Sequence, residues 1–488
     1  MKVEPVVIVG GGLAGLAAAE SISRLAPNVP VTLVEAKRRT GGRAGSFDDP
    51  QGGQVDYCQH VAMGCCGNLL DLMERTSLLQ HWHRDQSLTF LHPGVAASRF
   101  RPHPWLLAPF HMLPFLDALK FLSHSERREI RSGLVKLART PSHALSGVVA
   151  TDWLRKVGQT ETTIQSFWNV ILVSALGEQC DRVSMAAARK VLIDGFAIAR
   201  GASDVLIPML PLAELFGQRL PEVLRQRGIK LLTETRVEEI RPDRTVLLRQ
   251  VGCESEFVTA SAVVSAVPWF RVKSLFGGWD EMTRASLPDL SSFDQFPSSP
   301  ITGIHLWFDR PITELDHAVM VGTISQWLFR DPRLLREPQL RDSPQCEQSR
   351  PDQRDSGWYY QVIISASADA IGIGKEALVS QVLDELRGFF PDARSANLLR
   401  YRVVTDPESV FSISPEMDAK RPPSRTALDW LFLAGDWVQT GWPATMEGAV
   451  ISGRMAAAGV LRQLGIQADE AIPRGQSPGW LAKLLIRK

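Results

Sequence analysis

The sequence predicts an α/β protein, and three observations support this prediction. First, an apolar run at Val6–Val9, a glycine-rich turn at Gly10–Gly15 and an alanine-rich stretch predict a strand, a tight turn and a helix in that order. Second, another apolar run at Val31–Val34 ends in an acid, Glu35. Third, a strand at 430–434 leads into a small-residue helix near the C-terminus. Strands that alternate with helices in this way predict a parallel sheet.

The first turn has the spacing of a dinucleotide-binding fingerprint. Gly10 permits the tight turn, Gly12 lets the backbone approach a pyrophosphate, and Gly15 allows close packing of helix on strand. The distance from Gly15 to Glu35 matches the roughly 20 residues that separate such a turn from the acid that accepts the ribose hydroxyls. The sequence therefore predicts a Rossmann-like cofactor domain, with cofactor contacts at Gly10, Gly12, Leu13, Ala14, Gly15, Glu35 and Ala36.

Two further segments are expected at the same cofactor. The loop after Glu35 contains Gly42 and Arg43, and an arginine supported by glycines suits a diphosphate. Near the C-terminus, a strand ends in Gly435-Asp436, and a helix begins near Met446. An acid at a strand end and backbone amides at a helix start suit a ribityl chain and a flavin carbonyl. The two ends of the chain are therefore predicted to build one site.

The rest of the chain divides by composition. Alternating residues at 237–240 and 245–248 predict antiparallel strands, and 262–267 predicts a buried strand that returns to the first sheet. The cofactor domain is predicted to consist of three separate segments, 1–64, 216–284 and 426–465. The remaining segments are 65–215 (mainly helical, facing substrate or membrane), 285–425 (substrate-domain sheet with a polar insertion at 338–356) and 466–488 (C-terminal tail).

The composition of the chain excludes several classes of protein. The 488 residues carry a net charge of +1, which gives no general attraction to nucleic acid. No apolar run reaches the roughly 18 residues of a membrane-spanning helix, and no secretory leader is evident, so a cytoplasmic protein is expected. Six cysteines without C-x-x-C spacing predict neither a zinc site nor a disulfide framework. No metal is expected.

Four motifs together resemble the flavin amine oxidase and phytoene desaturase superfamily: the fingerprint, Gly41-Gly42-Arg43, a mid-chain Val-Val-Ser-Ala-Val-Pro, and Ala434-Gly435-Asp436. Within it, the phrases at 59–65 and 435–449 look most like the squalene-associated FAD-dependent enzymes, the hydroxysqualene dehydroxylases. The resemblance implies an FAD domain of the glutathione-reductase/amine-oxidase type, a mixed-sheet substrate domain and a helical subdomain. It further implies that the backbone of Val237 meets the adenine and that Asp436 and Met446 serve the ribityl and ring end. No cysteine lies between 430 and 460 to tether the ring, so noncovalent FAD is expected.

The same resemblance implies a reaction, the reductive dehydroxylation of hydroxysqualene to squalene in squalene and hopanoid biosynthesis. A leaving hydroxyl needs a proton donor. The candidates are His60 and Glu447, which lie in these two phrases, and Asp56, which lies just before the first of them. Each is also suited to bracing a turn. The implied partners are a long-chain isoprenoid substrate, an external electron donor and an upstream squalene-synthase-like enzyme that hands over the substrate.

Other interpretations of the residues stay open. A carotenoid-type desaturase or isomerase would use the same flavin and the same tunnel, a flavin amine oxidase would need a polar pocket, and a flavoprotein without catalysis would have no open cavity at the ring. A hydrocarbon substrate predicts peripheral contact with the inner face of a membrane. Two segments fit such contact: 104–116, which is apolar and aromatic, and 480–488, which is short, basic and amphipathic.

Overall fold

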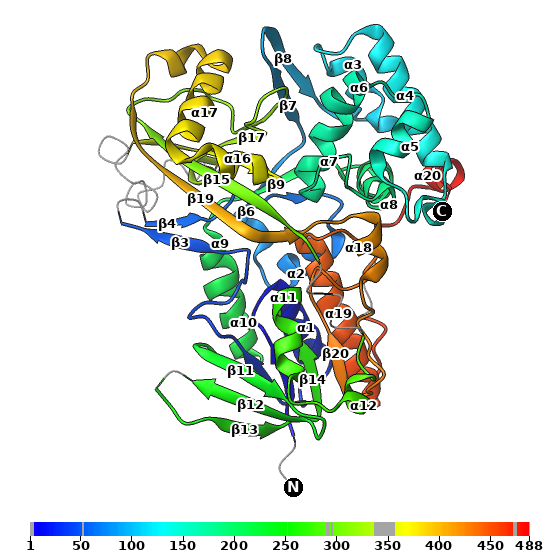
Figure 1. Cartoon of the computed structure of the whole chain (residues 1–488), viewed down its shortest axis with the longest axis vertical. Helices are drawn as coiled ribbons and strands as arrows, with labels where there is room; N and C mark the ends of the chain where they lie inside the picture. Colours follow the sequence, from blue (N-terminus) through cyan, green and yellow to red (C-terminus); the bar gives the residue numbers. More distant parts are fainter. Residues whose placement is uncertain are drawn as a thin grey trace.

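The computed structural model describes residues 4–50, 53–250, 252–288, 293, 296–335, 357–471 and 476–487. Figure 1 shows a parallel sheet with its helices at the lower end, and a mixed sheet and a group of helices side by side at the upper end. The parallel sheet has the strand order β10-β2-β1-β14-β20, with bounds Lys230–Leu232, Val31–Val34, Val6–Val9, Ala262–Ser265 and Leu431–Leu433. Segments from both ends of the chain thus meet in one sheet.

The core of this sheet follows from its residues. The four side chains of β1 are buried. Val6 and Ile8 pack among residues of helices on one face of the sheet, whereas Val7 and Val9 belong to a cluster on the other face that includes residues of a small antiparallel sheet. Helix α1 (Leu13–Leu25) packs along α19 (Met446–Gln463). A side chain at Gly453 would lie 2.1 Å from the Ala14 carbonyl oxygen, so the two helices approach closely only because this residue is glycine.

A small antiparallel sheet extends from the parallel one. Strands β11 (Thr235–Ile240), β12 (Thr245–Gln250) and β13 (Glu256–Thr259) pair in chain order. The alternating pattern predicts the first two, and β13 is an addition. The chain then returns through β14, which pairs in parallel with β1. This antiparallel excursion leaves β11 beside the end of β2.

The second large sheet has seven strands in the order β19-β15-β18-β17-β16-β7-β8, with bounds Leu398–Phe411, Ser298–Phe308, Trp358–Ser365, Trp327–Arg330, His317–Met320, Leu88–His92 and Val95–Phe100. It is mixed, because β16 and β7 run parallel while the other pairs are antiparallel. The stretch 65–215, expected to be mainly helical, contributes β7 and β8 to this sheet. The turn His92-Pro93-Gly94 is the local signal for that hairpin. The polar insertion predicted at 338–356 lies outside the described residues.

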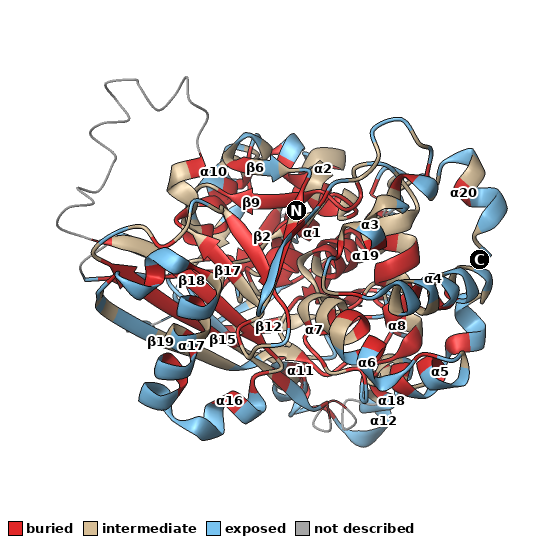
Figure 2. Ribbon diagram, turned by 90° about the horizontal axis from the view of Figure 1, so that it is seen from above, coloured by how far each residue is buried: buried red, intermediate tan, exposed pale blue. Residues whose placement is uncertain are grey.

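The helical region occupies the upper right of Figure 1 and includes α3 (Pro114–Ala118), α4 (His124–Arg139), α5 (Ala150–Lys156), α7 (Asn169–Leu176), α8 (Met185–Arg189) and α20 (Trp480–Leu485). Figure 2 shows the inner surfaces of this region buried and the outer surfaces of α4 and α20 exposed. Within the described ranges, no helix is long and apolar enough to span a bilayer.

Candidate functional site

A cavity of about 990 Å³ lies at the carboxyl ends of β1, β2, β14 and β20 and extends to the mixed sheet. The carboxyl edge of a parallel sheet is the expected place for a dinucleotide. All the predicted cofactor residues except Gly15 line the cavity: Gly10, Gly12, Leu13, Ala14, Glu35, Ala36, Gly42, Arg43, Val237, Gly435, Asp436 and Met446. Sequence segments more than 400 residues apart therefore share one site.

The glycine-rich turn is shaped to bind an anion. Gly10 has a φ of +106°, which favours glycine, and a side chain there would meet the Ala266 carbonyl oxygen at 2.7 Å. Helix α1 begins without a side-chain cap, so its first amides are left for a ligand. A Cβ atom at Gly12 would come no closer than 4.0 Å to another atom, the Cα of Gly42. The space beside Gly12 is thus open to a pyrophosphate.

Gly15 acts from outside the cavity. A Cβ atom at this position would lie 2.0 Å from the Gly10 carbonyl oxygen. The absence of a side chain at Gly15 therefore lets α1 rest directly on the turn, which is the packing role that the fingerprint predicts.

Glu35 is buried at the end of β2 and holds the turn. Its Oε2 accepts a hydrogen bond from the Gly11 amide at 2.7 Å, and its Oε1 accepts one from the Lys37 amide at 2.8 Å. A carboxylate oxygen can accept more than one hydrogen bond, so both oxygens keep capacity for ribose hydroxyls. The geometry fits the predicted role.

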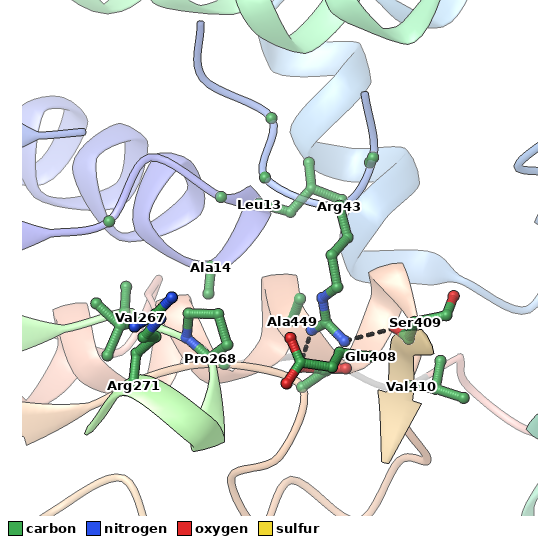
Figure 3. A pocket seen from close by; sticks show the side chains of 18 of the residues that line it. Leu13, Ala14, Arg43, Val267, Pro268, Arg271, Glu408, Ser409, Val410 and Ala449 are labelled. Carbon is green, nitrogen blue, oxygen red and sulfur yellow. Dashed lines mark hydrogen bonds and ion pairs between the residues drawn. The ribbon is translucent and has the colours of Figure 1, made fainter. Parts of the chain in front are cut away.

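Arg43 crosses the cavity and joins three regions of the chain. Its guanidinium donates to Oδ1 of Asp436 at 2.5 Å and to the Ser409 carbonyl at 2.7 Å, and it lies 5.3 Å from the centre of the Trp269 ring. Figure 3 shows the side chain reaching across the cavity to the backbone of Ser409. The Arg43 side chain thus links the loop after β2 to β19 and to the loop after β20.

Hydrogen bonds from a buried arginine hold the loop after β20 in place. The buried guanidinium of Arg421 donates to the carbonyl of Asp436 at 3.0 Å and to that of Val438 at 2.7 Å. Helix α19 begins directly after this loop, and the Thr445 hydroxyl accepts a hydrogen bond from the Gly448 amide at 3.1 Å. The amide of Met446, the first residue of the helix, remains at the cavity wall as a donor suited to a flavin carbonyl.

His60 is the one predicted proton-transfer residue that lines the cavity. Its Nδ1 lies 2.8 Å from the Cys58 carbonyl, which makes Nδ1 the donor and leaves Nε2 as the acceptor of a neutral ring. Burial is the largest effect and lowers the pKa of His60; the hydrogen bond to the Cys58 carbonyl and the negative charge of Asp406 raise it, and the positive charge of Arg43 lowers it. At neutral pH this imidazole is therefore uncharged and can accept a proton.

The structure places the other two candidates elsewhere. Glu447 is buried and accepts hydrogen bonds from the Asn68 amide at 3.0 Å, the Asn68 side chain at 2.9 Å and the Leu69 amide at 2.8 Å. These amides belong to the first turn of α2 (Gly67–Arg75), so Glu447 ties α19 to α2. Glu447 does not line the cavity.

Asp56 ends β4 (Gly53–Asp56) and also lies outside the cavity. It is paired in register with Ser46, whose hydroxyl donates to Oδ1 of Asp56 at 2.6 Å, and the amide of Leu212 donates to the same oxygen at 2.8 Å. Burial raises the pKa of Asp56 from 3.8 to about 7, although both hydrogen bonds lower it. The geometry supports a bracing role.

This placement predicts a pH-dependent effect of Asp56→Asn on stability. Because the pKa is raised in the folded state, the contribution of Asp56 to stability is complete below pH 3.8 and is lost as the pH rises through about 7. Asparagine stays neutral and keeps both hydrogen bonds. We expect its free energy of unfolding, relative to wild type, to increase by about 3 kcal/mol between pH 5 and pH 8, measured by urea unfolding. A difference that does not change with pH would contradict this placement of the charge.

The far wall of the cavity was not predicted from the sequence. This wall includes Ser174–Gly177 at the end of α7, together with Ile301, Val404, Asp406, Glu408, Ser409 and Val410 of the mixed sheet. The pairing of β19 with β15 shifts register between Asp406 and Val410, around Pro407. A proline inside a strand pattern is the sequence signal for such an irregularity. The shift lies where Ser409 accepts its hydrogen bond from Arg43.

A cavity that joins a dinucleotide-binding turn to a second sheet is the arrangement expected of an oxidoreductase with a dinucleotide cofactor. A family model described as flavin containing amine oxidoreductase matches residues 13–461, and the chain belongs to that family. The family is one of enzymes with a flavin cofactor. The open turn at Gly12, the uncapped start of α1 and the amide of Met446 fit such a cofactor.

Similar proteins extend over nearly the whole chain. The zeta-carotene desaturase of a Synechocystis species is 27% identical, with 93% of this chain and 97% of that protein covered. The 15-cis-phytoene desaturase of Synechococcus elongatus is 25% identical, with 93% and 95% covered.

Solved structures share the fold. An oxidoreductase from Methanosarcina mazei has a TM-score of 0.67 at 16% identity and covers 94% of this chain and 100% of that chain. A putrescine oxidase has a TM-score of 0.66 at 14% identity, with 94% and 99% covered. The predicted fold class is confirmed.

The comparisons correct the predicted activity. The expectation of a hydroxysqualene dehydroxylase is wrong, because the relatives are named as carotenoid desaturases. The phrases at 59–65 and 435–449 supported that expectation, but His60, Asp436 and Met446 within them line the cofactor cavity. Residues that serve a shared cofactor do not distinguish one substrate from another.

Proposed function

We propose that this protein is an FAD-dependent desaturase of a long carotenoid-type hydrocarbon. The observation on which the proposal rests is that carotenoid desaturases are similar to this chain over 93% of its length. The electrons then leave the substrate, so the external partner is an electron acceptor.

The composition of the far wall supports a hydrocarbon substrate. Where the cavity meets α7 and the mixed sheet, Ala175, Leu176, Ile301, Val404 and Val410 present apolar side chains. An amine substrate would need a cage of aromatic rings around its ammonium group. Among the described residues that line the cavity, the phenyl and phenol rings are those of Tyr57 and Phe270. Tyr57 and Phe270 are two rings and do not by themselves enclose a cation, whereas the apolar side chains of this wall suit a hydrocarbon chain.

FAD, when bound, supplies a two-electron acceptor for the hydride of a substrate C–H bond. In this proposal His60 receives the proton that must leave the neighbouring carbon as the double bond forms. Its Nε2 is the free acceptor, because Nδ1 is committed to the Cys58 carbonyl.

The test is direct. The purified chain, loaded with FAD and supplied with an added quinone as oxidant, is incubated without dioxygen with phytoene or zeta-carotene in detergent micelles. We expect products with longer conjugation and red-shifted absorption, separated by chromatography. Isomerised but equally conjugated products would overturn the proposal in favour of an isomerase. Inert carotenoids together with turnover of an amine would overturn it in favour of an amine oxidase.

A further inference from the structure

We propose that one outer surface of the helical region docks on a lipid bilayer with anionic headgroups. This surface, here called the apolar face, is formed by the loop 104–113 and by α20. Its members are large apolar side chains that are exposed: Trp105, Leu107, Phe110, Leu113, Trp480 and Leu484. Trp105 is 83% exposed, Trp480 68% and Leu484 75%. Soluble proteins rarely leave so many large apolar groups together in water.

The loop and the helix form one surface. A Cβ atom at Gly479, just before α20, would lie 3.9 Å from the Cβ of Ala108 in the loop. The segment 198–200 holds both. The Ile198 carbonyl accepts a hydrogen bond from the Gly479 amide at 3.3 Å, and the Arg200 guanidinium donates one to the Pro104 carbonyl. In Figures 1 and 2, α20 lies at the outer edge of the helical region. The two segments predicted from sequence are thus neighbours.

The orientation of α20 is fixed. Arg189 is only 2% exposed, and its guanidinium donates to the Arg487 carbonyl just after the helix. The Arg487 amide donates in turn to the Ala138 carbonyl at 3.0 Å. Ala482 is buried on the inner side. Trp480 and Leu484 therefore point outward because the helix is held in place, which differs from a frayed terminus.

The charges around the apolar face indicate what binds to it. The segments 100–113 and 476–487 contain no acidic residue, and their basic residues Arg101, Lys483 and Arg487 are exposed, as is the neighbouring Arg200. Apolar side chains that project between basic ones match the boundary of a bilayer, where Trp lies at headgroup level and Lys and Arg extend toward phosphates. The most exposed side chains project from the surface, whereas a protein partner's side chains need a pocket to fill. The charge therefore favours anionic lipid over a protein.

Vesicle sedimentation tests the proposal independently of catalysis. The flavin-loaded protein is mixed with vesicles of phosphatidylcholine alone or with added phosphatidylglycerol. We expect binding that increases with phosphatidylglycerol and falls with salt. Trp480→Ser with Leu484→Ser should lower the partition coefficient about a hundredfold, and Trp105→Ser alone about tenfold. Lys483→Glu should lower it on anionic vesicles by about tenfold or more, since each basic residue at such a surface contributes about fivefold and the charge is reversed.

A matched control comes from another region of the molecule. Met282 in α12 (Glu281–Arg284) is 87% exposed, and both views place α12 away from α20. Met282→Ser should leave binding unchanged. Equal loss in this control would overturn the proposal, as would binding that ignores lipid charge. A lipid-free dimer that dissociates in the Trp480→Ser variant would also overturn it and would assign the face to a second copy of the chain. Because the readout is vesicle binding, its failure is separate from failure of the proposed desaturation.

Discussion

Gly12→Ala should abolish FAD binding at micromolar concentrations and leave the fold intact. The backbone at Gly12 is extended, with φ −72° and ψ 177°, and a Cβ atom there meets nothing within 3.9 Å, so alanine fits the protein itself. The added methyl group instead occupies the space through which a pyrophosphate must approach the backbone. We expect the Kd for FAD to rise by at least about a hundredfold, which corresponds to about 2.7 kcal/mol. Flavin fluorescence titration of the apoprotein measures this change.

Gly15→Ala provides the matched comparison three residues away. Its Cβ atom would lie 2.0 Å from the Gly10 carbonyl oxygen, so α1 must move off the turn. This variant should lose thermal stability even without flavin, whereas the apo form of Gly12→Ala should unfold at the wild-type temperature. If Gly12→Ala retains FAD, the pyrophosphate does not lie at this turn, and the assignment of the cavity's cofactor end is wrong.

The cofactor end of the site could be predicted from sequence because local geometry determines it. A glycine turn between a buried strand and a helix has few conformations, and the acid of Glu35 follows at a fixed spacing. Asp436 lies hundreds of residues away, yet a strand pattern that ends in glycine and an acid predicts it as well. Each of these residues lies at the cavity because its own strand ends there.

The proton-transfer residues could not be predicted in the same way. Asp56 and His60 lie four positions apart in one phrase, yet Asp56 turns to Ser46 and Leu212 while His60 lines the cavity. Only the pairing of β3 (Ser46–Asp49) with β4 determines which side chain turns away. The far wall of the cavity could not be predicted for the same reason, since Asp406 and Val410 reach the cavity through the long-range pairing of β19 with β15. Sequence patterns report local structure and leave such pairings open.

His60→Asn should remove most of the desaturase activity and leave FAD bound. The asparagine amide can donate to the Cys58 carbonyl in place of Nδ1, so the loop keeps its hydrogen bond, but no group remains that accepts a proton as Nε2 does. We expect kcat to fall by about 10²–10⁴. The Kd for FAD should stay close to that of wild type, because a merely structural role for His60 would weaken binding and activity together.

The pH profile separates a base from a positioning residue. The acceptor form of His60 is the neutral ring, and burial, with the charge of Arg43, lowers its pKa below the ordinary value of 6.5. The kcat/KM of wild type should therefore stay constant from neutral pH down through 6.5 and fall only at lower pH, as the ring becomes protonated. His60→Asn should lack this acidic limb at its reduced rate. An acidic limb that persists in the variant would assign the proton transfer to another group in the cavity. Asp406→Asn is the next variant to test, because Asp406 lines the cavity and its charge acts on His60.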